Sequence, residues 1–216
     1  MSRQTYLPLY RKVARHARAI PGHVQRWNHN RRGTFVFIHI NKTAGSSVES
    51  ALGVPIEHYT AKEKIEQIGL KAWEERFTFA FVRNPWDRAV SHFHYRVNRN
   101  RTNLGRDPIS FERWIDEVFV MRNPAFRNYE KMFVSQVSWI SDECGKFLVD
   151  EVYRFEELHK NFDIACRKIG VSATLPHKKR VERASYQSFY NDRTREIIAN
   201  EYISDIQEWG YQFEPE

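Results

Sequence analysis

The sequence predicts an α/β domain whose central parallel β-sheet is flanked by helices, and three observations support this class. Two apolar runs, residues 35–40 and 77–82, are typical of strands buried on both faces, because such strands are hydrophobic without alternation. A polar turn and then an amphipathic segment follow each run, which is the strand–turn–helix order of parallel sheets. The 216 residues also suffice for one domain of this kind with a full core.

The first strand leads into a turn, Asn-Lys-Thr-Ala-Gly-Ser-Ser at residues 41–47, and then into a helix expected over 45–52. Free backbone N–H groups and the positive end of a helix bind phosphate or sulfate. The turn differs from the ATPase loop G-x-x-x-x-G-K-[ST], because Lys42 precedes the glycine. The sequence therefore predicts a P-loop-like anion site.

A second segment is built in the same way, with Arg-Asn-Pro-Trp-Asp-Arg-Ala-Val-Ser at residues 83–91 directly after the strand 77–82. Asn84 is a good N-cap and Pro85 suits the first helical position, so a helix is expected over about 85–97. Arg83 comes at the carboxyl end of its strand, where open α/β sheets bind their ligands. Two anion sites on one sheet predict a ligand with two separated phosphate-like groups.

The remaining elements follow from capping signals and apolar spacing. Thr60 and Glu63 form a capping box, which predicts a helix from there to about Gly69, and Ser110 is expected to cap another. Strands are expected at 147–149 and 152–155, and a helix over 156–169. A last long helix is expected over 192–208, with Gly210 ending it. Residues 98–108 are polar and predict a surface loop, whereas 122–146 show no firm period.

Charge and composition limit the possible partners and location. Lys and Arg exceed Asp and Glu by 7, which fits an anionic cofactor, an acidic polymer, nucleic acid or a membrane surface. Cys144 and Cys166 lack metal-site spacing and are expected to be reduced thiols. No apolar stretch approaches the ~20 residues that span a bilayer, and no secretory signal is present, so a cytoplasmic location is expected. Residues 1–33 form a basic arm, expected to pack on the domain, with weak membrane-surface or acidic-polymer contact as the alternative.

The two motifs together resemble the PAPS-dependent sulfotransferase superfamily, most closely its carbohydrate branch of heparan/chondroitin-type and bacterial enzymes. The resemblance implies that 34–216 is a sulfotransferase domain, that the donor is 3′-phosphoadenosine 5′-phosphosulfate (PAPS, product PAP), and that no metal is needed. It places the 5′-phosphosulfate on Lys42, Thr43, Ala44, Gly45, Ser46 and Ser47, and the 3′-phosphate on Arg83 and Ser91. A late basic segment would also touch the nucleotide, through Arg180 or else Lys179 or Arg183. One departure is Asn41, where many relatives have proline.

Sulfuryl transfer to a hydroxyl is an in-line displacement, in which fixed donors stabilise the charge that develops on the leaving phosphate. Lys42 suits that role. An acceptor hydroxyl needs a base, and we expect His58, which lies between the two motifs and matches the region where related enzymes carry a base histidine. Glu57 is the weaker candidate. His39 is expected to be a core histidine. His92 and His94 are expected to lie on the surface, with the lining of an acceptor cleft as the alternative.

The acceptor is expected to be a hydroxyl compound and most simply a saccharide, with Arg96, Arg99, Arg101 and Arg106 as candidate contacts. Two other hypotheses remain open from the sequence. One is a kinase that uses the first loop for ATP. The other is a basic module that binds nucleic acid or an acidic polymer through its positive arm. The sulfotransferase hypothesis itself expects no nucleic-acid partner, and the oligomeric state is not predicted.

Overall fold

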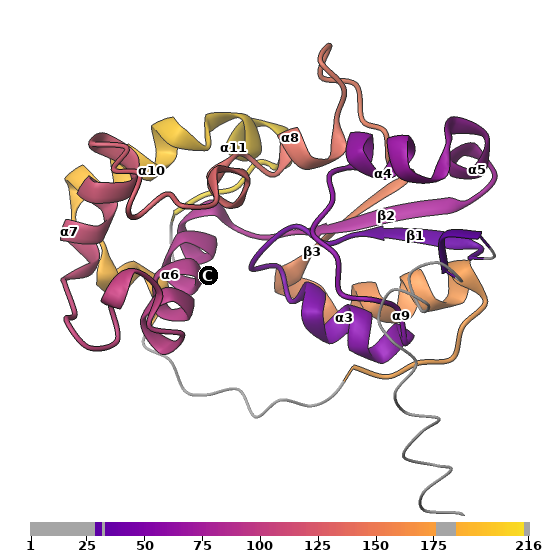
Figure 1. Ribbon diagram of the computed structural model, residues 1–216, viewed down its shortest axis with the longest axis horizontal. Coiled ribbons are helices and arrows are strands. Elements are labelled where there is room, and N and C mark those ends of the chain that lie inside the picture. The colour runs from indigo at the N-terminus through magenta and orange to yellow at the C-terminus, as the bar shows by residue number, and fades with distance from the viewer. Residues whose placement is uncertain (1–28, 32, 176–184, 214–216) are drawn as a thin grey trace, which may run out of the picture.

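The computed structural model describes residues 29–31, 33–175 and 185–213. Among these residues, β1 (Phe35–Ile38), β2 (Phe77–Val82) and β3 (Glu151–Arg154) form one sheet in the order β1-β2-β3. Both pairs of neighbours are parallel, with Phe35 opposite Phe77 and Phe79 opposite Glu151. The predicted α/β class with a central parallel sheet is therefore confirmed (Figure 1).

Each face of the sheet has its own core, because successive side chains of a strand point to opposite faces. Phe35, Phe79 and Phe81 pack on the side of α3 (Gly45–Leu52) and α9 (Leu158–Ile169). Ile38 and Val82 belong to the other core, with α4 (Ala61–Ile68) and α5 (Leu70–Glu74). Figure 1 shows α3 and α9 below the sheet and α4 and α5 above it, so the sheet is covered on both faces.

A group of helices lies beyond the carboxyl ends of the strands, on the left of Figure 1. It contains α6 (Pro85–Asn98), α7 (Phe111–Ile115) with the π-helical turn η2 (Asp116–Val120), and α10 (Asp192–Glu201). Shorter pieces complete it: η1 (Arg101–Asn103), η3 (Glu130–Phe133), α8 (Val137–Ile140), η5 (Tyr186–Phe189) and α11 (Ile203–Trp209). Trp114 and Phe133 are fully buried in its centre. This group forms one wall of the site described below.

The predicted helix caps are present. Thr60 Oγ1 accepts a hydrogen bond from the backbone N–H of Glu63, and Glu63 Oε2 accepts one from the N–H of Thr60. The Asn84 side chain accepts from the N–H of Trp86, and Ser110 accepts from that of Arg113. These side chains satisfy N–H groups that the helices leave unpaired at their starts, which explains why the capping signals located the helices well.

Two sequence predictions of secondary structure are wrong. Residues 147–149 do not form a strand, because Phe147 makes only an isolated antiparallel bridge to Ser141. The predicted helix 192–208 is two helices, α10 and α11, separated at Tyr202, which has φ −114° and ψ 32°. The Tyr202 hydroxyl is buried and donates to the carbonyl of Phe133, so a tertiary contact holds the break.

The other predicted elements agree with the structure within a few residues. The helix expected over 156–169 begins with a 3₁₀ turn, η4 (Phe155–Glu157), before α9. Cys144 is exposed and Cys166 is buried, and both are free thiols. In the described part of the chain, none of the helices has the length and apolar character needed to traverse a bilayer. Most of the basic arm lies outside the described residues, but Asn30 accepts a hydrogen bond from Lys64 of α4.

Candidate active site

The turn between β1 and α3 is tightly folded. Lys42 and Ala44 both have left-handed backbones, with φ 69° and 65°. The Thr43 hydroxyl is buried and donates to the carbonyl of Ile40 at 2.8 Å, while the N–H groups of Ser47 and Val48 donate to the carbonyl of Ala44. Two reversals of the chain so close together bring the start of α3, with its positive partial charge, to the edge of the sheet.

Gly45 is required by its contact with His39. A Cβ atom at residue 45 would lie 1.8 Å from Cδ2 and 2.2 Å from Nε2 of the His39 ring. No side chain fits such a gap, because carbon atoms in contact are ~3.5–4.0 Å apart. The histidine ring therefore packs directly on the backbone at the first residue of α3.

Asn41, where the sequence resemblance implies proline, holds the turn through its side chain. Its Nδ2 donates to the carbonyl of Met132 at 2.9 Å, and its Oδ1 accepts from Nη2 of Arg88 at 2.9 Å. Arg88 is itself buried and also donates to the carbonyl of Val134. Hydrogen bonds to α6 and η3 thus fix the turn at a position where proline would fix it by its ring.

The second motif lies directly against the first. Nη1 of Arg83 donates to the carbonyl of Lys42 at 3.1 Å, and its Nε donates to Asp87 at 2.7 Å. The guanidinium also stacks over Phe155, 4.1 Å from the ring centroid. Arg83 forms an ion pair with Asp87, and Arg83 is buried. Ser91 is buried on α6.

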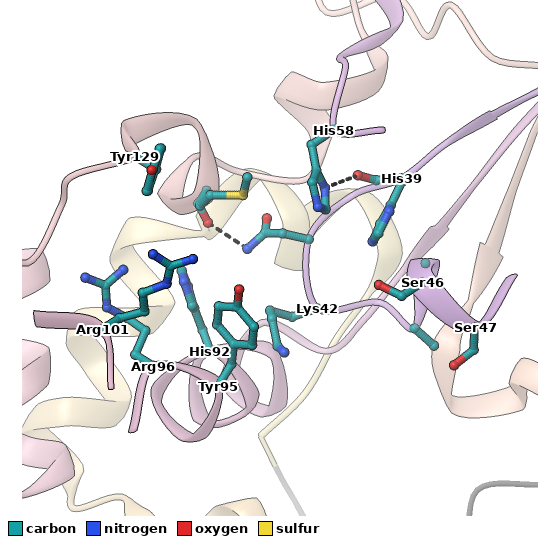
Figure 2. A pocket seen from close by; sticks show the side chains of 14 residues that line it. His39, Lys42, Ser46, Ser47, His58, His92, Tyr95, Arg96, Arg101 and Tyr129 are labelled. Carbon is teal, nitrogen blue, oxygen red and sulfur yellow. Dashed lines mark hydrogen bonds between the residues drawn. The ribbon is translucent and has the colours of Figure 1, made fainter. Parts of the chain in front are cut away.

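A cavity of about 440 Å³ opens beside the first loop (Figure 2). The lining comes from the first loop, from the segment that precedes α4, from helix α6 and from the region between η1 and η3. Within the described residues, it consists of His39, Asn41, Lys42, Ala44, Gly45, Ser46, Ser47, His58, His92, Tyr95, Arg96, Arg101, Tyr129 and Met132. The structure thus brings His58 together with five of the six predicted loop residues. Thr43, Arg83 and Ser91 are not part of this lining, and Arg180, Lys179 and Arg183 lie outside the described residues.

His58 lies at the edge of the cavity next to the loop. Its Nδ1 is 3.3 Å from the backbone carbonyl oxygen of His39, and the two rings are 4.1 Å apart between centroids. Burial, followed by the neighbouring His39, lowers the pKa of His58 to about 4, so the ring is neutral near pH 7. Glu57, the weaker candidate for the base, pairs with the buried ammonium of Lys64 and does not line the cavity.

The opposite side of the cavity is aromatic and cationic. Figure 2 shows Arg96, Arg101 and Tyr129 across the cavity from Ser46 and Ser47. Nη2 of Arg96 donates to the Thr102 hydroxyl at 2.6 Å, which fixes its guanidinium. Of the four arginines considered for the acceptor, Arg96 and Arg101 line the cavity, and Arg99 and Arg106 do not.

Two further lining residues lie near Lys42. The Lys42 ammonium is 4.5 Å from the ring centroid of Tyr95. The expected surface position of His92 is wrong, because His92 is buried and stacks on Phe133 at 4.6 Å. It lies in the cavity lining, which was the alternative. Burial lowers the pKa of His92 well below its ordinary value. Tyr95 could have been found from the sequence, since it follows Ser91 by one helical turn on α6, whereas Tyr129 and Met132 come from a segment without a period.

Comparison with known proteins decides the family. The model of the sulfotransferase family matches residues 26–212, which is most of the chain. The protein belongs to the sulfotransferase family. It is therefore an enzyme that transfers sulfuryl groups, and the kinase and binding-module hypotheses are not supported.

A solved structure agrees with this assignment at the level of the fold. The chain is similar to a crystal structure of a sulfotransferase from Alicyclobacillus acidocaldarius, with a TM-score of 0.50 and 14% sequence identity. The similarity covers 81% of this chain and 92% of the other. A search of curated protein sequences finds no match. Among the described residues, no cluster of His, Cys, Asp and Glu side chains is placed to hold a metal ion.

Proposed function

We propose that this sulfotransferase moves the sulfuryl group of PAPS to a hydroxyl group of a carbohydrate, with His58 as the base. The observation that carries the proposal is the composition of the cavity. One wall holds the anion-binding loop with Lys42, the edge beside it holds a neutral histidine, and the opposite side has room and contacts for an acceptor. Donor, base and acceptor would thus meet in one space.

The loop residues fit a phosphosulfate group. The start of α3 carries a positive partial charge, Gly45 has no side chain to block an anion, and Lys42 and Ser46 line the same cavity. The resemblance assigns the 3′-phosphate to Arg83 and Ser91, and Arg83 already contacts the backbone of Lys42. Since Asp87 pairs with Arg83, binding a phosphate there would require the guanidinium to share its N–H groups between the two anions.

Each residue then has a defined role in the transfer. Bound PAPS would supply a sulfur atom whose leaving group is PAP. His58 would accept the proton of the acceptor hydroxyl while that oxygen bonds to sulfur and the sulfur–oxygen bond to the 5′-phosphate breaks. Lys42 and the N–H groups at the start of α3 would stabilise the negative charge that remains on the 5′-phosphate.

The far side of the cavity supports a saccharide acceptor. Tyr129 is 59% exposed and Tyr95 is 38% exposed, so both offer accessible ring faces at the rim. An aromatic ring with a polar tip can pack on the apolar face of a sugar and still reach water. Arg96, which is held by Thr102, and Arg101 add hydrogen-bond donors for hydroxyl or acidic groups of such a ligand.

Calorimetry and turnover together test this function. PAP should bind without magnesium, and Lys42→Ala should weaken binding and abolish transfer, while the control Lys71→Ala, an exposed lysine on α5, should match the wild type. Transfer is measured with labelled PAPS against a panel of saccharides and simple alcohols. Preference for Mg-ATP over PAP would refute the proposal. So would a wild type that transfers nothing from PAPS but binds an acidic polymer, with that binding unchanged in Lys42→Ala.

A further inference from the structure

Glu49 is a buried carboxylate on α3 that the transfer chemistry does not use. It is 2% exposed, and burying a carboxylate is costly unless charged or hydrogen-bonding partners compensate. Its Oε2 lies 2.8 Å from Nδ1 of His39, and its Oε1 accepts a hydrogen bond from the backbone N–H of Glu57 at 2.9 Å. One carboxylate therefore joins the end of the first strand to the segment that precedes α4.

Both partners of Glu49 hold His58. The carbonyl oxygen of His39 lies 3.3 Å from Nδ1 of His58, and the ring of His39 lies against that of His58, with 4.1 Å between centroids. Glu57 directly precedes His58 in the chain. The hydrogen bond that holds the backbone N–H of Glu57 therefore also restrains the backbone position of His58. The His39 ring cannot shift toward α3, because it already packs on Gly45.

The contact with the carbonyl also selects the tautomer of His58. A carbonyl oxygen only accepts, so a hydrogen bond at this place requires Nδ1 of His58 to carry the proton. Nε2 then keeps its lone pair, which is the form that a general base needs. The position of the His39 backbone and ring thus determines which nitrogen of His58 can accept a proton.

We propose that Glu49 is a positioning residue for the base: it holds His39 and the backbone of Glu57, and through them it sets the position and the tautomer of His58. The inference rests on the proposed function of His58. Among the described residues, His39 after β1 and Lys131 from η3 act on His58 electrostatically. Glu49 from α3 pairs with His39, and Glu63 from α4 pairs with Lys131.

The charge effect acts through His39. The Glu49 carboxylate is paired with the His39 ring, and His39 is among the groups that lower the pKa of His58. After burial, His39 is the largest cause that lowers the pKa of His58 to about 4. Since Glu49 pairs with the His39 ring, we expect removal of its charge to weaken the influence of His39 and to raise the pKa of His58 toward its ordinary value.

Glu49→Gln tests the proposal, with the exposed Glu66→Gln on α4 as the matched control. The amide keeps the size of the side chain and an oxygen for the N–H of Glu57, but it removes the charge. We expect kcat to fall about 10- to 100-fold, as for a base displaced by a fraction of an ångström, with the Kd for PAP changed by less than about twofold. NMR of labelled histidine should show His58 titrating at higher pH than in the wild type.

His39→Asn provides a second route if Glu49→Gln does not fold, and it should give the same upward shift of the His58 titration. An unchanged kcat in Glu49→Gln would overturn the proposal. So would a lower kcat with an unchanged His58 titration, because that result would make Glu49 a support of the fold alone. A wild type without transfer from PAPS would refute the proposed function, while the NMR titration would still decide the link from Glu49 to His58.

Discussion

Replacing Gly45 by alanine tests the packing of the first loop, and the structure allows its cost to be derived. The added Cβ would lie 1.8 Å from Cδ2 of His39, about 1.7 Å closer than the shortest ordinary carbon contact. The backbone of Gly45 is not left-handed, so conformational strain contributes nothing to the cost. Because His39 is buried against Glu49, the ring cannot turn away without breaking that pair.

We expect Gly45→Ala to lower the free energy of unfolding by about 1–3 kcal/mol, as overpacking of a buried site does. In a His39→Ala background the histidine ring is absent. Gly45→Ala should then be neutral or stabilise the fold by about 0.5–1 kcal/mol, because alanine has a higher helix propensity than glycine. Urea denaturation of the four proteins of this cycle measures the coupling.

Gly53→Ala is the contrasting control. Gly53 ends α3 with φ 66°, and no atom of the described residues lies within 4 Å of the place that its Cβ would take. The cost of this change therefore arises from the left-handed backbone, and it should be equal with and without the His39 ring. Equal costs of Gly45→Ala in the two backgrounds, within about 0.5 kcal/mol, would refute the packing argument.

Three further predictions concern the base, the 3′-phosphate and pH. His58→Asn should keep the affinity for PAP and lower single-turnover transfer about 10²- to 10⁴-fold, and full activity would remove His58 as the base. Arg83→Ala should weaken binding of PAP far more than that of AMP in calorimetry, whereas equal losses would exclude Arg83 from the 3′-phosphate site. Burial lowers the pKa of both His29 and His58 to about 4, so the unfolded chain binds more protons below pH 6.5. Stability should therefore decrease as pH falls from 6.5 toward 4, and urea midpoints that stay constant between pH 7 and 5 would contradict this.

Local signals predicted the framework of the fold well. The apolar runs of β1 and β2, and the caps at Thr60, Asn84 and Ser110, depend on residues that are neighbours in the chain, so the sequence shows them directly. The break at Tyr202 depends on a hydrogen bond to Phe133, which is 69 positions away, and no local pattern reports it. The same limit explains the false strand at 147–149, whose apolar residues pack on the core outside the sheet.

The site was predictable where a motif carries it and not where tertiary contacts do. Lys42 and Gly45 to Ser47 were expected from the strand–turn–helix pattern and His58 from its place between the two motifs, and all of them line one cavity. His39, by contrast, looks like any core histidine in the sequence. Its importance appears only when Glu49 and His58 are seen on either side of it, since Glu49 carries no motif and lies in the middle of an ordinary helix.

A crystal structure of the complex with PAP tests the central claim most directly. The account predicts the 5′-phosphate against residues 42–47 at the start of α3, and the 3′-phosphate within hydrogen-bond distance of Arg83 and Ser91. A nucleotide bound at the Arg96 and Arg101 side with the loop empty, or one whose 3′-phosphate points away from Arg83, would contradict it.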